Sequence, residues 1–214
     1  MLAWGGWKFK VEPVEMDETP LEGEAPGRYV LRLAEAKARA AAAAVKQEGI
    51  ILAADTTVVD GNTTLGKPAS SEEAVSMLRR LRGRDHFVYT AIAVLDTNQQ
   101  KLITDLCVSR VIMRHYSDDE IDTYVTSGDP FDKAGAYAIQ HRQFNPVINF
   151  HDCFANVVGL PLCHLVRTLR RLDISPLLDI PLACQENLGY KCAVFHSVLW
   201  YDYQPSDPRF EFWH

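Results

Sequence analysis

The sequence predicts an α/β fold, because segments with helical periodicity alternate with segments that are typical of strands. Residues 28–48 are rich in alanine with apolar side chains at helical spacing, and residues 50–55, IILAAD, form a short apolar run typical of a buried strand. Residues 86–96 and 101–116 are rich in β-branched side chains and are separated by a polar turn. The short connections leave an α+β arrangement open as well.

The first helix is predicted over residues 28–48 and is followed by Gly49, a residue type that often ends helices. Its apolar face is formed by Val30, Leu33, Ala34 and Ala38. After the apolar strand, residues 60–68 read DGNTTLGKP, and the Asp-Gly pair and the proline predict a turn.

Two further helices carry clear end signals. Residues 70–83 have a serine at the start, acids in the first turn, arginines in the last turn and a closing glycine. Residues 117–128 likewise begin with a capping serine and early acids and end in glycine. Residues 128–140 are punctuated by glycine and are expected to be partly extended, and residues 156–172 predict a loop that leads into a fourth helix.

Composition excludes several classes of protein. A formal net charge of -6 argues against non-specific binding along nucleic acid phosphates. No apolar run reaches the roughly eighteen residues of a membrane span, and the first residues do not have the pattern of a secretory signal. Five cysteines, an odd number without CxxC spacing, argue against a zinc site or a disulfide framework. We therefore expect a cytoplasmic globular protein with reduced thiols.

The chain is expected to divide into a main domain, residues 1–172, and an aromatic-rich extension, residues 173–214. Eight of the 21 aromatic residues fall in the extension. They are Tyr190, Phe195, Trp200, Tyr201, Tyr203, Phe210, Phe212 and Trp213. Because that density is high for a disordered tail, we expect an ordered appendage that packs on the main body or on a second subunit.

Three charged residues are candidates on local chemistry. Asp55 follows the apolar run at the expected carboxyl edge of a strand, where open α/β sheets bind ligands, although capping of the following turn is the more common role of an aspartate in such a place. Lys67 lies between a glycine and a proline, where its ammonium group could meet a phosphate or could simply be solvated. Lys37 lies in the apolar stripe of the long helix and by itself fits an ordinary surface lysine.

Asp17 and Glu18 form a pair of acids in a turn before the long helix. Such carboxylates could hold a hard divalent cation through their oxygens, although a polar turn without a ligand explains the pair as well. The sequence contains no HExxH, HxH, Walker, GxGxxG or GxSxG motif. A histidine-bound metal, the corresponding nucleotide-binding loops and a serine hydrolase are therefore not predicted.

Four segments, taken in order, resemble the Maf family of nucleoside triphosphate pyrophosphatases. They are DETPLEGEAPGRYVLRLAEAKA at 17–38, AADTTVVDGNTTLGKPASSEEAVSMLRRLRGRDHFVYT at 53–90, SGDPFDKAGAYAIQ at 127–140 and NVVGLPL at 156–162. Four motifs in the family's order are far more specific than any one of them. The resemblance implies an elongated mixed sheet flanked by helices, with a cleft between two lobes.

The resemblance also implies an activity: hydrolysis of a nucleoside triphosphate to the monophosphate and pyrophosphate, with a divalent metal such as Mg²⁺ or Mn²⁺. Asp55 matches the family's catalytic carboxylate, and Glu18 and Asp55 match the metal-binding acids. The substrate-binding positions correspond to Lys37, Lys67, Gln140, Thr56 and Lys133, and Asp132 matches a further motif position. The GLPL ending of the last motif resembles the branch that acts on dTTP and UTP. A homodimer and an association with arrest of septum formation are also implied.

Two departures from the family pattern affect the expected function. The family normally begins with a short strand and a Ser-x-Arg-Arg segment that contacts the triphosphate, whereas this sequence opens with MLAWGGWKFKVEP. We expect either a misassigned start or weakened phosphate binding, together with an open sheet edge. After Gln140 the family usually has glycine, whereas His141, Arg142 and Gln143 follow here and are expected to alter the nucleobase pocket. A catalytically weak nucleotide-binding regulatory protein of the same fold is therefore the alternative function.

Overall fold

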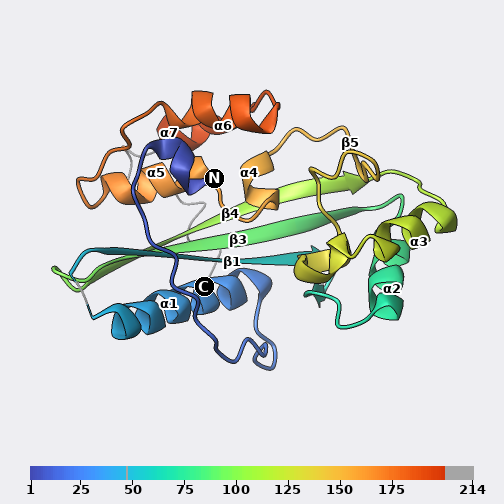
Figure 1. The fold of residues 1–214 in the computed structure, drawn as a ribbon, viewed down its shortest axis with the longest axis horizontal. Coiled ribbons are helices and arrows are strands. Elements are labelled where there is room, and N and C mark those ends of the chain that lie inside the picture. The colour runs from blue at the N-terminus through green and yellow to red at the C-terminus, as the bar shows by residue number, and fades with distance from the viewer. Residues whose placement is uncertain (47, 201–214) are drawn as a thin grey trace.

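The computed structural model describes residues 1–46 and 48–200, which are arranged around one long sheet (Figure 1). Its strands are β1 Ile50–Asp60, β2 Thr63–Leu65, β3 Asp85–Asp96, β4 Lys101–Met113 and β5 Val147–Ile148, in the spatial order β2-β1-β3-β4-β5. β1, β3 and β4 contain 11, 12 and 13 residues, so each spans roughly 35–45 Å at about 3.3 Å per residue. The predicted α/β class with an elongated sheet is confirmed.

The strand pairing explains where the sheet is open. All four pairings of described strands are antiparallel, whereas the resemblance implied a mixed sheet. Short turns join β1 to β2 and β3 to β4, and antiparallel neighbours need no longer connection. β1 pairs with β3 along almost its whole length but with β2 only at Val58, Val59 and Asp60. Among the described strands, the first two thirds of β1 therefore has a neighbour on one side only.

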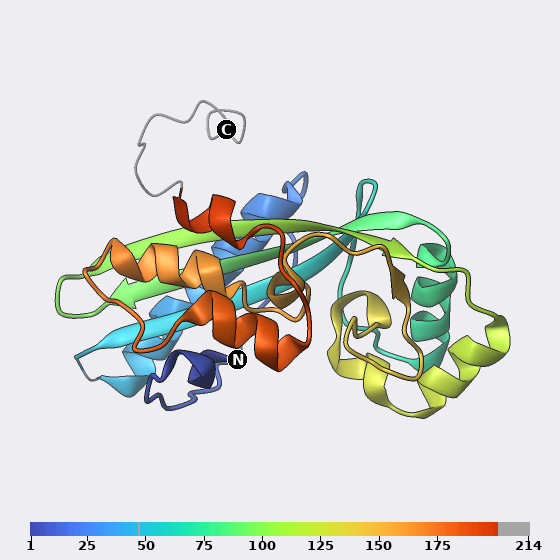
Figure 2. The same cartoon turned by 90° about the horizontal axis from the view of Figure 1, so that it is seen from above.

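Helices cover both faces of this sheet. They are α1 Pro26–Val45, α2 Ser71–Leu81, α3 Asp118–Thr126, α4 Phe154–Val157, α5 Leu162–Arg170, α6 Ile180–Leu188 and α7 Phe195–Trp200, with 3₁₀ turns η1 Leu2–Gly5, η2 Asp129–Asp132 and η3 Ala134–Ala136. Figure 1 shows α1 on one face and α4, α5 and α6 on the other, and Figure 2 shows α2 and α3 together at one end.

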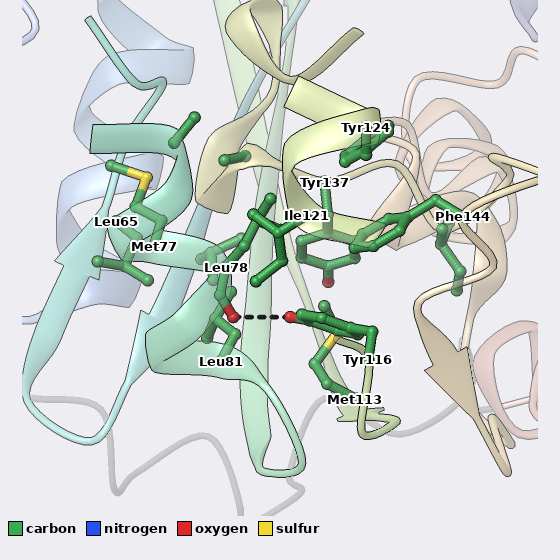
Figure 3. Packing of buried hydrophobic residues seen from close by; sticks show 14 of the residues in the cluster. Leu65, Met77, Leu78, Leu81, Met113, Tyr116, Ile121, Tyr124, Tyr137 and Phe144 are labelled. Carbon is green, nitrogen blue, oxygen red and sulfur yellow. Dashed lines mark hydrogen bonds between the residues drawn. The ribbon is translucent and has the colours of Figure 1, made fainter. Parts of the chain in front are cut away.

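Separate apolar clusters hold these layers and define two lobes. α1 packs against β3 through small side chains such as Ala34 and Ala38, while α5 and α6 pack on the opposite face of the sheet around Leu165. The other lobe is built by α2, α3 and the segment after them, as the close view in Figure 3 shows. There Tyr116 donates its hydroxyl proton to the carbonyl oxygen of Leu78 over 2.7 Å, so the buried phenol keeps a hydrogen-bond partner.

The predicted serine caps at the starts of α2 and α3 are confirmed. The Ser70 hydroxyl accepts a hydrogen bond from the backbone N–H of Glu73 (3.2 Å), and Ser117 forms a capping box with Glu120. The predicted end of the first helix at Gly49 is wrong. α1 ends at Val45 because Lys46 itself takes the left-handed conformation, with φ of 49°, and its N–H bonds back to the carbonyl of Ala42.

The predicted strand 50–55 is too short, and this changes the position of Asp55. β1 continues to Asp60 because Val58 and Val59 pair with both β2 and β3 and Asp60 pairs with Thr63 of β2. β2 itself lies within the segment predicted as a turn. Asp55 therefore lies in the middle of β1, opposite Ala91 of β3. Neither the predicted strand end nor the turn-capping alternative is correct.

The described part of the extension packs on the main body. Ile180 of α6 is buried among residues of α5, and the Tyr190 hydroxyl contacts the carbonyl oxygens of Phe150 (3.2 Å) and Asp152 (3.1 Å). The predicted role of Tyr201, Tyr203, Phe210, Phe212 and Trp213 lies outside the described residues. Within residues 1–46 and 48–200, no helix is both long and apolar enough to cross a membrane.

Candidate active site

A cleft of about 670 Å³ lies between the two lobes at the open part of β1, within the size range of ligand sites. It brings together every site residue that the family resemblance implied, whereas Asp17 is not among its lining residues. They are Glu18, Lys37, Asp55, Thr56, Lys67, Lys133 and Gln140, with Asp132 beside them. Tyr29 of α1 and Tyr137, which follows η3, line the same cleft. Segments from the first sixty residues and from residues 132–140 thus meet at one strand.

Asp55 and Lys37 form the most buried charged pair of the cleft. Lys37 Nζ lies 2.6 Å from Asp55 Oδ1 and 2.6 Å from Glu18 Oε1, so one ammonium group bridges two carboxylates. Burial raises the pKa of Asp55, the ammonium group of Lys37 opposes this, and the net pKa lies above the usual value. Burial lowers the pKa of Lys37, but the two carboxylates raise it by more than that. The net pKa therefore lies above the usual value, and the lysine stays charged.

The pleat of β1 sends Asp55 and Thr56 to opposite faces of the sheet. Asp55 points to the α1 face, where it meets Lys37. Thr56 points to the α4 face, where its hydroxyl lies 2.9 Å from that of Thr90, its partner on β3. Because β1 has no described neighbour along this edge, a ligand in the cleft could reach both faces at once.

Lys67 and Lys133 both line the cleft from the second lobe, but of the two only Lys133 forms ion pairs with neighbouring carboxylates in the described part of the chain. Lys67 is exposed and lies near enough to Asp55 to lower the pKa of that carboxyl. Lys133 donates to Asp132 (2.6 Å) and to Asp129 (3.2 Å), and these carboxylates raise the pKa of Lys133 more than its burial lowers it. The second lysine is therefore held in place by its own loop.

Glycine allows this loop to reach β1. The N–H of Gly135 donates to the carbonyl of Gly66 (3.0 Å), which joins the loop of Lys133 to the loop of Lys67. Gly135 has φ of 71°, and a Cβ there would lie only 2.9 Å from Val58 Cγ2. A larger residue would push the loop away from the strand.

Gln140 is exposed at the far end of the same loop, whose course is fixed by Tyr124. The Tyr124 hydroxyl donates to Asp129 (2.6 Å) and accepts from the N–H of Ala138 (3.0 Å). His141 packs its ring on Tyr124, with centroids 4.7 Å apart, and lines a separate hollow beside α3. His141 is not among the residues that line the cleft, so the expected change of the nucleobase pocket does not arise from its side chain.

Sequence reasoning missed three residues that shape the cleft: Tyr29, Thr90 and Asn156. Tyr29 donates its hydroxyl to the carbonyl of Glu18 (2.8 Å), which holds the acidic turn against α1. Thr90 and Asn156 are fully buried and form hydrogen bonds behind Thr56. Tyr29 lies two turns before Lys37 on the same helix, which is a usable signal, whereas a threonine within a strand pattern gives none.

The fold and the cleft together define an α/β protein in which lysines and carboxylates meet at a strand edge. The chain belongs to the Maf family, since the family model described as "Maf-like protein" matches residues 1–172.

Curated relatives agree with this assignment. The dTTP/UTP pyrophosphatase of Dehalococcoides mccartyi (strain ATCC BAA-2266 / KCTC 15142 / 195) is 43% identical over 171 residues, which cover 80% of this chain and 76% of the relative. The dTTP/UTP pyrophosphatase of Geobacter sp. (strain M21) is 42% identical over 79% of this chain and 88% of its own length. A protein of that name from Pelotomaculum thermopropionicum (strain DSM 13744 / JCM 10971 / SI) is 41% identical, with coverages of 80% and 90%.

Proposed function

We propose that this chain hydrolyses nucleoside triphosphates to the monophosphate and pyrophosphate, with dTTP and UTP as substrates. The observation that carries the proposal is the meeting of Asp55, Lys37 and Glu18 with Lys67 and Gln140 in one cleft. Family membership and the names of the relatives support the reaction class and the two pyrimidine substrates.

The cleft has a charged side and a less polar side, which match the two parts of a nucleotide. On the α1 face of β1 lie the carboxylates and the ammonium group of Lys37. On the α4 face the cleft is lined by Thr56 and by apolar side chains, among them Val88, Val157 and Val158. We assign the triphosphate to the first side and the base to the second.

Asp55 is assigned as the general base that takes a proton from the attacking water. Its net pKa is raised by burial, which makes the carboxylate a better proton acceptor than an ordinary aspartate. The carboxylate is still oriented by Lys37 at 2.6 Å. Attack at the α-phosphorus then releases pyrophosphate, whose developing negative charge Lys37 and Lys67 would stabilise.

The residues present fit a divalent cation, which the family resemblance implies. Lysines and carboxylates balance among the cleft residues, three against three, so the cleft alone does not neutralise a triphosphate. Glu18 and Asp55 each place a carboxylate oxygen 2.6 Å from Lys37 Nζ, so the two carboxylates lie close to one another. Mg²⁺ is commonly held by one or two carboxylates together with substrate phosphates and water. No group of three or more histidine, cysteine or acidic side chains suited to a metal occurs among the described residues. We assign the cation, Mg²⁺ or Mn²⁺, to Glu18 and Asp55, where it would supply positive charge against the triphosphate.

Three further assignments complete the proposal, of which the location rests on composition and the other two on the resemblance. We assign activity to residues 1–172 and treat residues 173–214 as an appendage, in keeping with the match of the family model to the first segment. A cytoplasmic location and a homodimeric state complete the proposal, and size-exclusion chromatography with light scattering tests the latter.

The decisive experiment measures pyrophosphate release from dTTP, UTP, CTP and GTP with Mg²⁺ or Mn²⁺. Asp55→Asn should abolish turnover while the protein stays folded, because the amide cannot accept the proton. Asp122→Asn, a change of the same kind at an exposed position of α3, is the control and should keep full activity. A folded wild-type protein that binds these nucleotides without releasing pyrophosphate would instead support the regulatory alternative.

A further inference from the structure

Thr90 lies directly behind Thr56, on the side of β1 that we assign to the base. It is fully buried on β3, in register with Thr56. Its hydroxyl oxygen lies 2.9 Å from the Thr56 hydroxyl oxygen and 3.0 Å from the backbone carbonyl oxygen of Asn156. These two contacts together fix which way each proton points.

A carbonyl oxygen can only accept a hydrogen bond, so Thr90 must donate its single hydroxyl proton to Asn156. The proton in the 2.9 Å contact between the two threonines then has to come from Thr56. With that proton directed at Thr90, Thr56 has only lone pairs left to offer the cleft. The chain of two bonds is also cooperative, because each polarises the next.

The acceptor at the end of this chain is held rigidly. The side-chain amide of Asn156 donates to the carbonyl of Val88 (3.0 Å) and to the hydroxyl of Ser109 (2.9 Å), and both contacts are buried. The carbonyl of Asn156 also accepts the N–H of Gly159 (2.9 Å). Asn156 therefore cannot turn away, and the direction of the hydrogen bonds through Thr90 is built into the fold.

We propose that Thr90 is a positioning residue for base selection, which makes Thr56 a pure hydrogen-bond acceptor toward the base. Uracil and thymine carry a donor at N3, whereas cytosine carries a lone pair there and would be repelled. Gln140 cannot make this distinction alone, since it is exposed and its amide offers both a donor and an acceptor. This inference rests on the proposed pyrophosphatase activity and adds a selection rule to it.

The first test uses the wild-type protein and four triphosphates. UTP should be preferred over CTP, and 3-methyl-UTP, which has no N3–H, should lose about tenfold in kcat/KM relative to UTP. 5-Methyl-UTP carries the same added methyl group but keeps the N3 donor, so it should behave like UTP. Equal use of UTP and CTP, or of the two methylated substrates, would overturn the proposal.

The second test removes the hydroxyl behind Thr56. Thr90→Val should raise KM for UTP and lower the UTP-to-CTP ratio of kcat/KM by about tenfold, with a smaller change in kcat. The ratio falls because the Thr56 proton is then free to point into the cleft. Thr90→Ser keeps the donor and should restore the ratio. Thr168→Val, the same change at a buried threonine of α5 away from the cleft, should leave the ratio unchanged.

Thr56→Val is the second variant if Thr90→Val does not fold, and it should lower the UTP-to-CTP ratio in the same way. An unchanged ratio in folded Thr90→Val or Thr56→Val contradicts the positioning role but leaves the pyrophosphatase intact. The proposed activity itself fails only if the wild-type protein releases no pyrophosphate from any substrate. The two failures are therefore distinguishable.

Discussion

Two neighbouring residues of β1 face very different surroundings. Asp55 lies in a charged cluster with Lys37 and Glu18, in which one ammonium group bridges two carboxylates at 2.6 Å each. Thr56 lies against the neutral, fully buried hydrogen-bond network of Thr90 and Asn156. The pleat of a single strand separates the two environments.

This difference shows how one strand edge can serve two tasks. The charged side has one partly exposed end, since the side chain of Glu18 is half exposed while Asp55 is buried. The neutral side is rigid, because its network is anchored in the core. In the proposed function, the cation and the proton transfer are assigned to the first side, and base recognition, which needs a fixed direction, is assigned to the second.

The largest effect is expected from Lys37→Met, which breaks the charged side. Losing the ammonium group should lower kcat/KM by about 10²–10³-fold, because it removes a preorganised positive charge. The ammonium group also lowers the pKa of Asp55, so its loss should move that pKa upward. Asp55 must be deprotonated to act as a base, so the acid limb of the pH profile of kcat/KM should shift to higher pH.

Lys37→Arg is the control for this prediction, because it keeps the positive charge beside both carboxylates. Its acid limb should stay close to that of the wild-type protein. An unshifted limb in Lys37→Met would mean that Asp55 is not the group that titrates.

The second effect concerns stability in acid and depends on His86. The Nε2 atom of His86 lies 2.8 Å from the hydroxyl oxygen of Tyr137, a residue that lines the cleft. Burial lowers the pKa of His86 to about 4. The unfolded state, with an ordinary pKa of about 6.5, binds more protons between pH 6.5 and 4. The free energy of unfolding should therefore fall as the pH drops through this window, by about 3 kcal/mol in total.

Urea unfolding of His86→Gln at pH 7, 5.5 and 4.5 checks this contribution, since glutamine does not titrate. His164→Gln is a useful comparison, because burial also lowers the pKa of His164 to about 4 while His164 lies in the other lobe. Each variant should lose part of the slope, and the double variant should lose most of it. An unchanged slope in all three would contradict the burial argument.

The third largest effect is expected from Asn156→Ala, which removes the side chain that anchors the neutral hydrogen-bond network. Asn156→Ala leaves the carbonyl of Val88 and the hydroxyl of Ser109 without their shared donor, which should lower the free energy of unfolding by about 1–3 kcal/mol. Asn187→Ala removes an amide that bonds the carbonyl of Ala183 on the exposed surface of α6 and should cost far less. Equal losses in the two variants would show that the buried network contributes nothing special.

The sequence alone predicts much of the fold, because its signals are local. Ser70 and Ser117 cap helices through neighbours three residues away, and the β-branched runs become β3 and β4. The end of β1 was missed because its last residues are set by pairing with β2 and β3, which is a tertiary choice. The prediction that the first helix ends at Gly49 is wrong because Lys46, three residues earlier, already adopts the left-handed conformation that ends the helix.

Some residues of the candidate site are likewise predicted from the sequence, whereas others are found only in the three-dimensional structure. Local chemistry makes Asp55 and Lys67 candidates, but Lys37 by itself fits an ordinary surface lysine. The assembly of these residues with Gln140 is predicted only by the family resemblance. Thr90 carries no such signal, since a threonine inside a strand is explained by strand preference alone. Its role depends on the direction of two hydrogen bonds that connect three distant segments, and this can only be seen in three dimensions.

The smallest effect is expected two residues after Lys37, at Arg39 on the outer surface of α1. Arg39 pairs with Glu35 at 2.9 Å, but the side chains are 59% and 42% exposed, so solvent screens most of the interaction. Arg39→Ala should change the free energy of unfolding by about 0.5 kcal/mol or less and leave kcat/KM and its pH profile unchanged. Parallel assays with Lys37→Met would then show that position on the helix, and not a positive charge on α1 in general, determines the chemistry at Asp55. A comparable loss of activity in both variants would instead point to a long-range effect of the helix charge.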